Sequence, residues 1–350
     1  MSDLSTHSQQ TKILLVKLSS LGDVLHNLPI VWDLRARLPN AQIDWVVEEG
    51  YVHLLTPLLS KDGFRGIDRI IPFGLRRWKK NLLKLSTWKE FFAFKKILQE
   101  TSYDVVIETQ GLLKSAIVCS LAKKTPNAVI AGLANATEFS GYEPIARSFY
   151  NQSVQVPIQC HAVDRSRWVM CSALDWPLLE RTSAPQFYPD QYIQSLRLPG
   201  MPITQQLSAP YVLCFHSTAR EAKRWPNSHW VALGKTLAAQ GYQVVLPWGN
   251  LAEQAVSKEI AAQIPNALVP PAFSIEDAFA VIAGAALTVG VDTGLTHLAA
   301  VLNKPTVEIY CDSPLWKTEG YWSSNIRNVG DIQKPPSVEQ VLQAATELLS

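Results

Sequence analysis

Short apolar runs alternate with polar turns along this chain, and the pattern is clearest over Leu287–Tyr310. A β-branched run at 287–291 is followed by an Asp-Thr-Gly turn, a short apolar helix, Asn-Lys-Pro and a second apolar run at 306–310. Length and residue type indicate strand, helix and strand, which is one βαβ unit. Ligands of open parallel sheets bind beyond the carboxyl ends of the strands, so we expect a site at the turn.

The residues of this turn indicate what it binds. Free amide groups at a helix start favour an anion, so Thr293 and Gly294 are predicted to hold a phosphate. A carboxylate repels phosphate, so we interpret Asp292 as an acceptor for nearby sugar hydroxyl groups. His297 lies on the same helix face as the turn. In an alternative interpretation, Asp292 only caps the helix and His297 is a buried core histidine.

The same pattern opens the chain. A strand is predicted over Lys12–Leu18, followed by a turn at 19–23 and a strand over Ala41–Val47. Between the turn and the second strand, one helix is predicted from apolar residues at helical spacing: Val24, Leu25, Leu28, Val31 and Leu34. Asp23 begins this helix, where the dipole favours an ionised carboxylate that could accept a proton from an attacking hydroxyl. Asp23 could equally be only a capping acid.

The remaining elements repeat this alternation in both halves of the sequence. Strands are predicted at 68–73, 104–107, 129–132, 211–216 and 243–247, and helices at 161–174, 228–240, 252–264, 274–284 and 337–349. The proline-rich stretch 177–210 lacks long apolar runs and is predicted to connect two domains, at 1–176 and 211–336. Two such series predict an α/β protein with two Rossmann-like domains facing a cleft.

Composition supports a globular protein and excludes several classes. The chain has 350 residues, more than one core usually serves, and 47% of them are hydrophobic. A net charge of +2 does not indicate general nucleic-acid binding. Five singly placed cysteines fit a reducing cytoplasm. The polar N-terminus is unlike a secretory signal, and no apolar run is long enough for a membrane span.

One segment, Arg76–Leu98, mixes many cations with aromatic residues. This mixture is typical of a surface that meets an anionic partner or a membrane. The alternative is a helix that buries its aromatic face while its lysines stay solvated. Arg76 and Arg77 precede the helical part and are the stronger candidates for binding an anion.

Common catalytic motifs are absent. The sequence has no G-x-G-x-x-G, H-E-x-x-H, C-x-x-C, D-x-D or G-x-S-x-G pattern, so we predict neither a standard dinucleotide site nor a metal site. The loop after the strand at 211–216 instead offers Ser217, Thr218 and Lys223, which could hold a diphosphate without a metal. Glu253 could accept from ribose hydroxyls. Alternatively, the loop is a solvated charged surface, and Glu253 only favours its helix start.

Several motifs in one order extend these observations. Together they resemble the type I members of the bacterial lipopolysaccharide heptosyltransferases, glycosyltransferase family 9. The resemblance covers about Lys12 to Tyr310, and it departs from the family's common turn at 311–316. The motifs are KLSSLGDVLHNLP at 17–29, DWVVEE at 44–49, RRW at 76–78, QGLLKS at 110–115, KRWP at 223–226, LPWG at 246–249 and VDTGLTHL at 291–298.

The resemblance implies a GT-B fold and an inverting transfer of heptose from ADP-L-glycero-D-manno-heptose to the first Kdo of Kdo2-lipid A, with no cofactor or metal. It implies that Asp23 is the general base and that Asp292 binds heptose hydroxyls. The implied donor site also contains Ser217, Thr218, Lys223, Glu253, Thr293, Gly294 and His297. The implied acceptor site contains Ser19, Ser20, Gly22, Arg76, Arg77, Gln110 and Lys114.

The family also suggests that the C-terminal helix at 337–350 packs back on the first domain. The basic and aromatic segment predicts that the protein works at the inner face of the cytoplasmic membrane, where the lipid acceptor lies. Three other functions remain compatible with the residues. They are a heptosyltransferase that acts later in the core, a sugar-nucleotide epimerase or hydrolase, and a non-catalytic nucleotide-binding module.

Overall fold

The computed structural model describes residues 10–61, 63–179, 185–196, 207 and 210–350. These residues divide into two compact units. The first unit contains the described residues up to Ser19 and those from Asn27 to Leu179. The second contains Ser20–His26 together with the described residues between 180 and Ser350. The chain therefore leaves the first unit for one short segment and returns to it.

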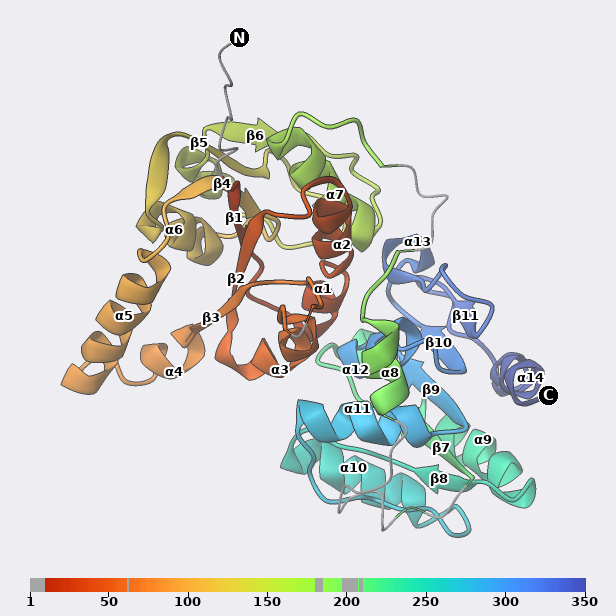
Figure 1. Ribbon diagram of the computed structural model, residues 1–350. Coiled ribbons are helices and arrows are strands. Elements are labelled where there is room, and N and C mark those ends of the chain that lie inside the picture. Colours follow the sequence, from red (N-terminus) through yellow and green to blue (C-terminus); the bar gives the residue numbers. More distant parts are fainter. Residues whose placement is uncertain (1–9, 62, 180–184, 197–206, 208–209) are drawn as a thin grey trace. The chain divides into compact units, whose positions relative to one another are not determined.

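The first unit is built on a parallel sheet of six strands, in the order β3-β2-β1-β4-β5-β6 (Figure 1). The strands are β1 (Lys12–Val16), β2 (Gln42–Glu48), β3 (Arg69–Phe73), β4 (Tyr103–Glu108), β5 (Lys124–Leu133) and β6 (Gln152–Val154). The strands β2 and β3 are added on one side of β1, and β4 to β6 on the other side. The carboxyl ends of β1 and β4 therefore border the crevice where such sheets bind ligands.

Six α-helices accompany this sheet in the part of the first unit that the structure describes. They are α2 (Pro29–Arg37), α3 (Val52–Leu55), α4 (Leu75–Lys79), α5 (Leu85–Leu98), α6 (Leu113–Leu121) and α7 (Ala162–Ala173). Figure 1 shows α4 and α5 at the β3 end of the unit. A hydrophobic cluster that includes Phe73, Trp78 and Phe94 anchors them to the sheet.

The prediction of a single helix after the turn at 19–23 is wrong. The structure has two helices, α1 (Leu21–Leu25) and α2, separated by a turn. The break falls before Pro29, which occupies the first position of α2. Proline lacks a backbone N–H and clashes with the preceding turn inside a helix, but it fits a first position. The break lets α1 join the second unit while α2 stays in the first.

The second unit has a parallel sheet of five strands, in the order β11-β10-β9-β7-β8. They are β7 (Tyr211–Phe215), β8 (Gln243–Val245), β9 (Leu287–Val291), β10 (Thr306–Tyr310) and β11 (Ile326–Gly330). The helices are α1, α8 (Asp190–Ser195), α9 (Asn227–Ala239), α10 (Leu251–Ala261), α11 (Ile275–Gly284), α12 (Gly294–Val301), α13 (Leu315–Thr318) and α14 (Val338–Leu349). Here β8 is added on one side of β7, and β9 to β11 on the other side, so the carboxyl ends of β7 and β9 border the binding crevice.

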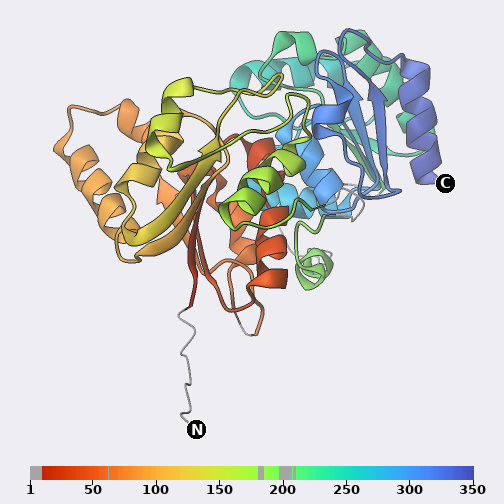
Figure 2. The same cartoon turned by 90° about the horizontal axis from the view of Figure 1, so that it is seen from above.

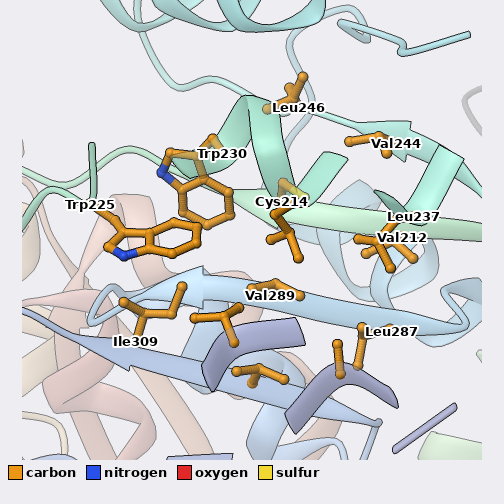
Figure 3. Close-up of a cluster of buried hydrophobic side chains, with 14 of the residues drawn as sticks. Val212, Cys214, Trp225, Trp230, Leu237, Val244, Leu246, Leu287, Val289 and Ile309 are labelled. Atoms are coloured by element: carbon orange, nitrogen blue, oxygen red, sulfur yellow. The ribbon is translucent and has the colours of Figure 1, made fainter. Parts of the chain in front are cut away.

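The C-terminal helix α14 packs in the core of the second unit, where Figure 2 shows it beside the strands of its own sheet. Val341, Ala344 and Ala345 of this helix are buried in one cluster with Trp225 and Trp230. Figure 3 shows these two indole rings together, and their centroids lie 5.1 Å apart. The expectation that this helix packs on the first domain is therefore wrong, because its apolar face packs within the second unit.

The strands β6 and β11 and the helix α8 were not predicted. The strand β6 has three residues, too few for a clear periodic signal, and β11 has Arg327 and Asn328 within its five residues, which interrupt its apolar run. Helix α8 lies inside the stretch predicted as a connection, where Tyr188 and Tyr192 pack against Phe279 of α11. Among the described residues, no helix is long and apolar enough to cross a membrane.

Candidate active site

Helix α1 packs directly on the start of α12, and two glycines permit the contact. A Cβ atom on Gly294 would lie 2.8 Å from the Cβ of Leu21 and 3.1 Å from the backbone nitrogen of Gly22. A Cβ atom on Gly22 would lie 3.3 Å from the ring of His297. The sequence analysis assigned Gly294 to phosphate binding and Gly22 to the acceptor; both assignments stay predictions, and the structure adds this close approach.

Asp23 therefore lies in the second unit and not in the first, where the sequence analysis placed it. Its carboxylate Oδ2 accepts from the backbone N–H of Ser20 at 3.0 Å and from the Ser20 hydroxyl at 2.7 Å. These contacts form a capping box at the start of α1. The capping alternative is thus present in the structure, and it fixes the carboxylate that we also expect to act as a base.

The residues after β9 form a buried network of charges. His297 donates from Nε2 to Asp292 Oδ1 at 2.9 Å and from Nδ1 to Glu308 Oε1 at 2.8 Å. The ring of His297 is almost fully buried, and Glu308 has no exposed surface. Because both ring nitrogens serve these carboxylates, His297 positions Asp292 in this arrangement and presents neither nitrogen to a phosphate.

The two carboxylates keep His297 positively charged. Burial alone would lower the pKa of His297, but the charge of Glu308 and the hydrogen bonds to Asp292 and Glu308 raise it to about 10. Burial alone would raise the pKa of Asp292, but His297 and Lys223 together hold it well below its usual value. At neutral pH, Asp292 is therefore an ionised acceptor next to an imidazolium.

Lys223 and the loop after β10 complete the surroundings of Asp292. The Lys223 ammonium lies 2.5 Å from Asp292 Oδ2, which also accepts from the Ser313 hydroxyl. Thr318 donates to Asp292 Oδ1 at 3.4 Å. Lys223 was predicted to hold a diphosphate, and in the structure it first neutralises Asp292.

A hollow at the carboxyl ends of β7 and β8 lies beside this network. Ser217, Thr218, Glu253 and Thr293 line a volume of about 250 Å³, together with Trp248. A second hollow of about 310 Å³ shares Ser217, Thr218 and Glu253. The structure therefore brings together four of the residues that the sequence analysis assigned to the donor. Glu253 also caps its helix, because its Oε2 accepts from the backbone N–H of Gly249 at 2.8 Å.

Below this hollow, the buried His216 orients the Ser217 hydroxyl. Its Nε2 lies 2.8 Å from Ser257 Oγ, and its Nδ1 lies 3.1 Å from Ser217 Oγ. Burial and the nearby charge of Arg224 lower the pKa of His216 to about 4, so the ring is neutral. The Ser257 hydroxyl donates to the carbonyl of Pro247, so we assign the ring proton to Nε2 and the acceptor role toward Ser217 to Nδ1.

The first unit brings together three predicted acceptor residues at the ends of β1 and β4. Gln110 Oε1 accepts from the backbone N–H of Ser19 at 3.3 Å, and its Nε2 donates to the Ser19 hydroxyl at 3.2 Å. The Lys114 ammonium donates to the same hydroxyl at 2.8 Å. The other predicted acceptor residues Ser20 and Gly22 belong to the second unit.

Arg76 and Arg77 lie near the carboxyl end of β2 and are paired with carboxylates. Arg76 Nε lies 2.6 Å from Glu48 Oε2, and its guanidinium stacks over the ring of Tyr51. Arg77 bonds to Glu49 at 2.9 Å and also pairs with Glu90. Both arginine side chains are exposed. Arg77 has two carboxylate partners, so Arg76 is the better placed of the two to meet an anion.

Glu308 and Ser313 were missed as site residues. Glu308 interrupts the apolar run of β10, and a lone carboxylate in a buried strand is the signal that could have identified it. Ser313 lies in the loop at 311–316, where the sequence departs from its family. The same loop contains Asp312, which pairs with Arg220 at 3.1 Å.

Solved structures with this architecture include heptosyltransferases and, at 12% sequence identity, UDP-N-acetylglucosamine 2-epimerases. The chain is similar to the structure titled "E. coli heptosyltransferase WaaC with ADP-2-deoxy-2-fluoro heptose", with a TM-score of 0.74 and 32% sequence identity. That match covers 96% of this chain and 99% of the other. The two parallel-sheet α/β units and this likeness give the protein the GT-B fold of these glycosyltransferases.

Sequence comparison gives the family. The pattern of "Glycosyltransferase family 9 (heptosyltransferase)" matches residues 91–347. The lipopolysaccharide heptosyltransferase 1 of Pseudomonas aeruginosa is 38% identical over 94% of this chain and 86% of its own length. That of Escherichia coli K12 is 36% identical over 85% of this chain and 87% of its own length. The chain belongs to glycosyltransferase family 9, the heptosyltransferases.

The contact between α1 and α12 yields a first prediction. Replacing Gly294→Ala inserts a methyl group where Leu21 and Gly22 now lie, so α1 must move and carry Asp23 with it. Because a displacement of about 1 Å at a catalytic group can cost about 10²-fold, we expect kcat for heptosyl transfer to fall by about that factor. Gly50→Ala is the control, because a Cβ atom there meets nothing within 4 Å. Equal kcat values for the two variants would contradict this role for Gly294.

The charge on His297 yields a second prediction. Since the pKa of His297 is raised to about 10 from an ordinary value of 6.5, its contribution to stability is complete below pH 6.5 and is lost as the pH rises toward 10. In histidine-labelled protein, the NMR signal that disappears in His297→Gln should keep its imidazolium shift at pH 8. The signal assigned by His216→Gln should be neutral there. Titration of the His297 signal near pH 6.5 would contradict the network.

Proposed function

We propose that this heptosyltransferase moves L-glycero-D-manno-heptose from ADP-heptose to the first Kdo of Kdo2-lipid A, with inversion at the anomeric carbon. One observation carries the proposal: an ionised Asp292, held by His297 and Lys223, lies beside a hollow lined by Ser217, Thr218 and Thr293. That arrangement offers an acceptor for sugar hydroxyls next to donors for a diphosphate. The relatives named lipopolysaccharide heptosyltransferase 1, and the similar structure with ADP-2-deoxy-2-fluoro heptose, support heptosyl transfer from an ADP-heptose donor.

The reaction is a single displacement at the anomeric carbon. The acceptor hydroxyl oxygen attacks that carbon, the bond from the carbon to the diphosphate oxygen breaks, and ADP leaves with the electron pair. Asp23 takes the proton of the attacking hydroxyl. The capping box supports this role, because Ser20 fixes the carboxylate of Asp23, and the packing of α1 on α12 carries that carboxylate next to the donor side.

Charge on the departing ADP is balanced by protein groups. Ser217 and Thr218 donate from the hollow, and the amides at the start of α12 point an electropositive helix end toward an anion. Lys223 shares its charge between Asp292 and the diphosphate. We propose that these groups replace a divalent cation, so that transfer continues in the presence of EDTA.

The acceptor binds at the carboxyl ends of β1 and β4. Lys114 and the Ser19 hydroxyl, which Gln110 orients, meet the carboxylate and hydroxyl groups of Kdo, and the exposed Arg76 meets a further anionic group. Charge-assisted bonds of this kind fix orientation as well as affinity. An epimerase or hydrolase would need no such cationic acceptor surface, which favours transfer over those alternatives.

Substitution of Asp23 tests the base directly. Asp23→Asn keeps an oxygen for the capping box but cannot accept a proton, so we expect kcat to fall by about 10²–10⁴-fold while donor affinity is unchanged. Asp277→Asn is the matched control, because Asp277 forms the same capping box with Ser274 in α11. Products are identified by mass spectrometry from ADP-heptose and Kdo2-lipid A in the presence of EDTA.

The outcomes separate the candidate functions. Unchanged transfer by Asp23→Asn would remove Asp23 from the base role. Consumption of ADP-heptose without any acceptor would indicate an epimerase or hydrolase. Transfer only to an acceptor that already carries heptose would indicate a heptosyltransferase that acts later in the core.

We further propose that the enzyme associates peripherally with the inner face of the cytoplasmic membrane. The segment from α4 to α5 supports this, because it exposes Leu82, Leu83 and Leu85 beside several exposed lysines. Apolar side chains beside cations are the combination that binds an anionic lipid surface.

Vesicle binding tests this location. We expect co-sedimentation with anionic phospholipid vesicles at low salt, and a loss of roughly 1 kcal/mol of binding per lysine in the triple variant Lys80→Gln, Lys84→Gln, Lys89→Gln. The control replaces three exposed lysines of the second unit: Lys235, Lys258 and Lys334. Equal binding of the two triple variants would contradict a membrane role for this segment.

A further inference from the structure

The first unit contains an apolar groove that the transfer chemistry does not use. It has a volume of about 510 Å³ and runs between the α4–α5 segment and α6. Phe73 and Trp78 are buried beneath it with their rings 5.3 Å apart, while Phe91 of α5 and Ile117 of α6 line its sides. A monomeric protein seldom leaves such apolar surface open without a function.

The indole and hydroxyl groups that line the groove already have hydrogen-bond acceptors within the protein. Trp78 Nε1 donates to Glu90 at 2.9 Å, Trp88 Nε1 donates to the carbonyl of Leu82 at 3.0 Å, and the Thr87 hydroxyl donates to the carbonyl of Asn81 at 2.8 Å. A bound peptide would bring backbone N–H and C=O groups that need partners. A hydrocarbon chain needs none, so the groove suits a hydrocarbon.

The groove is continuous with the proposed acceptor site. Lys114 lines it, and the ammonium of the same residue donates to the Ser19 hydroxyl at 2.8 Å. Lys79 lines the groove from α4 and is exposed. An amphiphile with an anionic sugar head could therefore place its head at Ser19 and Lys114 and direct a hydrocarbon chain into the groove.

We propose that this groove binds one acyl chain of the anionic glycolipid acceptor during transfer. The inference rests on the proposed function and adds a second point of recognition to it. Burial of the chain raises affinity for the acylated acceptor, because each methylene group removed from water contributes favourably. A deacylated acceptor has the same head group but lacks this contribution.

The test compares two acceptors with each protein. Initial rates are measured with ADP-heptose and either the acylated acceptor in mixed micelles or the same saccharide with every acyl chain removed. Ile117→Gln places a polar side chain in the groove, and we expect about tenfold lower kcat/KM with the acylated acceptor and no change with the deacylated one. Ile97→Gln is the matched control, because Ile97 is 41% exposed, as Ile117 is 39% exposed, and does not line the groove.

A second groove variant, Leu121→Gln at the end of α6, should reproduce the selective loss, and circular dichroism verifies that each variant is folded. Binding to acceptor-free phospholipid vesicles should be the same for Ile117→Gln and the unmodified enzyme. Loss of vesicle binding in parallel with turnover would assign the groove to bulk membrane lipid, and a changed molecular mass would assign it to a second copy of the chain. Either result would overturn the inference.

The remaining outcomes separate this inference from the proposed function. Equal effects of Ile117→Gln on both acceptors, or none on either, while the unmodified enzyme transfers to both, would overturn the groove alone. Absence of transfer to either acceptor by the unmodified enzyme would overturn the proposed function, and the groove's assignment to the acceptor with it.

Discussion

The positive charge on His297 is the constraint on which the donor side of this protein depends. Asp292 and Glu308 lie on either side of one imidazole, and all three groups are buried. Without the proton on His297, two buried carboxylates would have no cation between them, and removing one partner of a buried pair typically costs about 3–5 kcal/mol. The network thus joins β9, α12 and β10 and sets the orientation of Asp292 before any ligand arrives.

His297 also contacts α1. It projects from α12 toward Gly22, and the ring of the neutral His26 packs edge-on against it, with an interplanar angle of 68° and centroids 4.9 Å apart. Burial and the charge of His297 lower the pKa of His26 to about 4, so a second cation does not form there. The carboxylate of Asp23 on α1, which we propose as the base, therefore lies next to the same imidazolium that orients Asp292. A substitution of His297 would therefore affect both the orientation of Asp292 and the position of α1.

Local βαβ units were easier to predict from the sequence than contacts between segments that lie far apart in it. The βαβ unit from 287 to 310 was visible because a β-branched run, a glycine turn and an apolar helix each have a local signal. Membership of Asp23 in the second unit was not visible, because it depends on Gly22 and Gly294 meeting across more than 270 residues of sequence. The break before Pro29 was readable from the sequence, and it was overridden by the helical spacing of the apolar residues.

The acceptor side follows a similar logic with a different anchor. Glu108, at the end of β4, is fully buried and accepts from the backbone N–H groups of Gln110 and Gly111 at 2.7 and 3.0 Å. Gly111 has a φ of +75°, which a larger residue would rarely adopt, so the turn closes tightly onto Glu108. Gln110 is thereby fixed, and it fixes Ser19 in turn.

These contacts explain how the proposed acceptor side can fix its polar groups and still expose apolar side chains nearby. The polar recognition groups are held from below by a buried carboxylate, so they need no support from α4 and α5. These helices are then free to expose apolar and cationic side chains, which would be a liability on an ordinary surface. The acceptor that we propose is part saccharide and part hydrocarbon, and it requires both surfaces at once; Lys114 lies where the two meet.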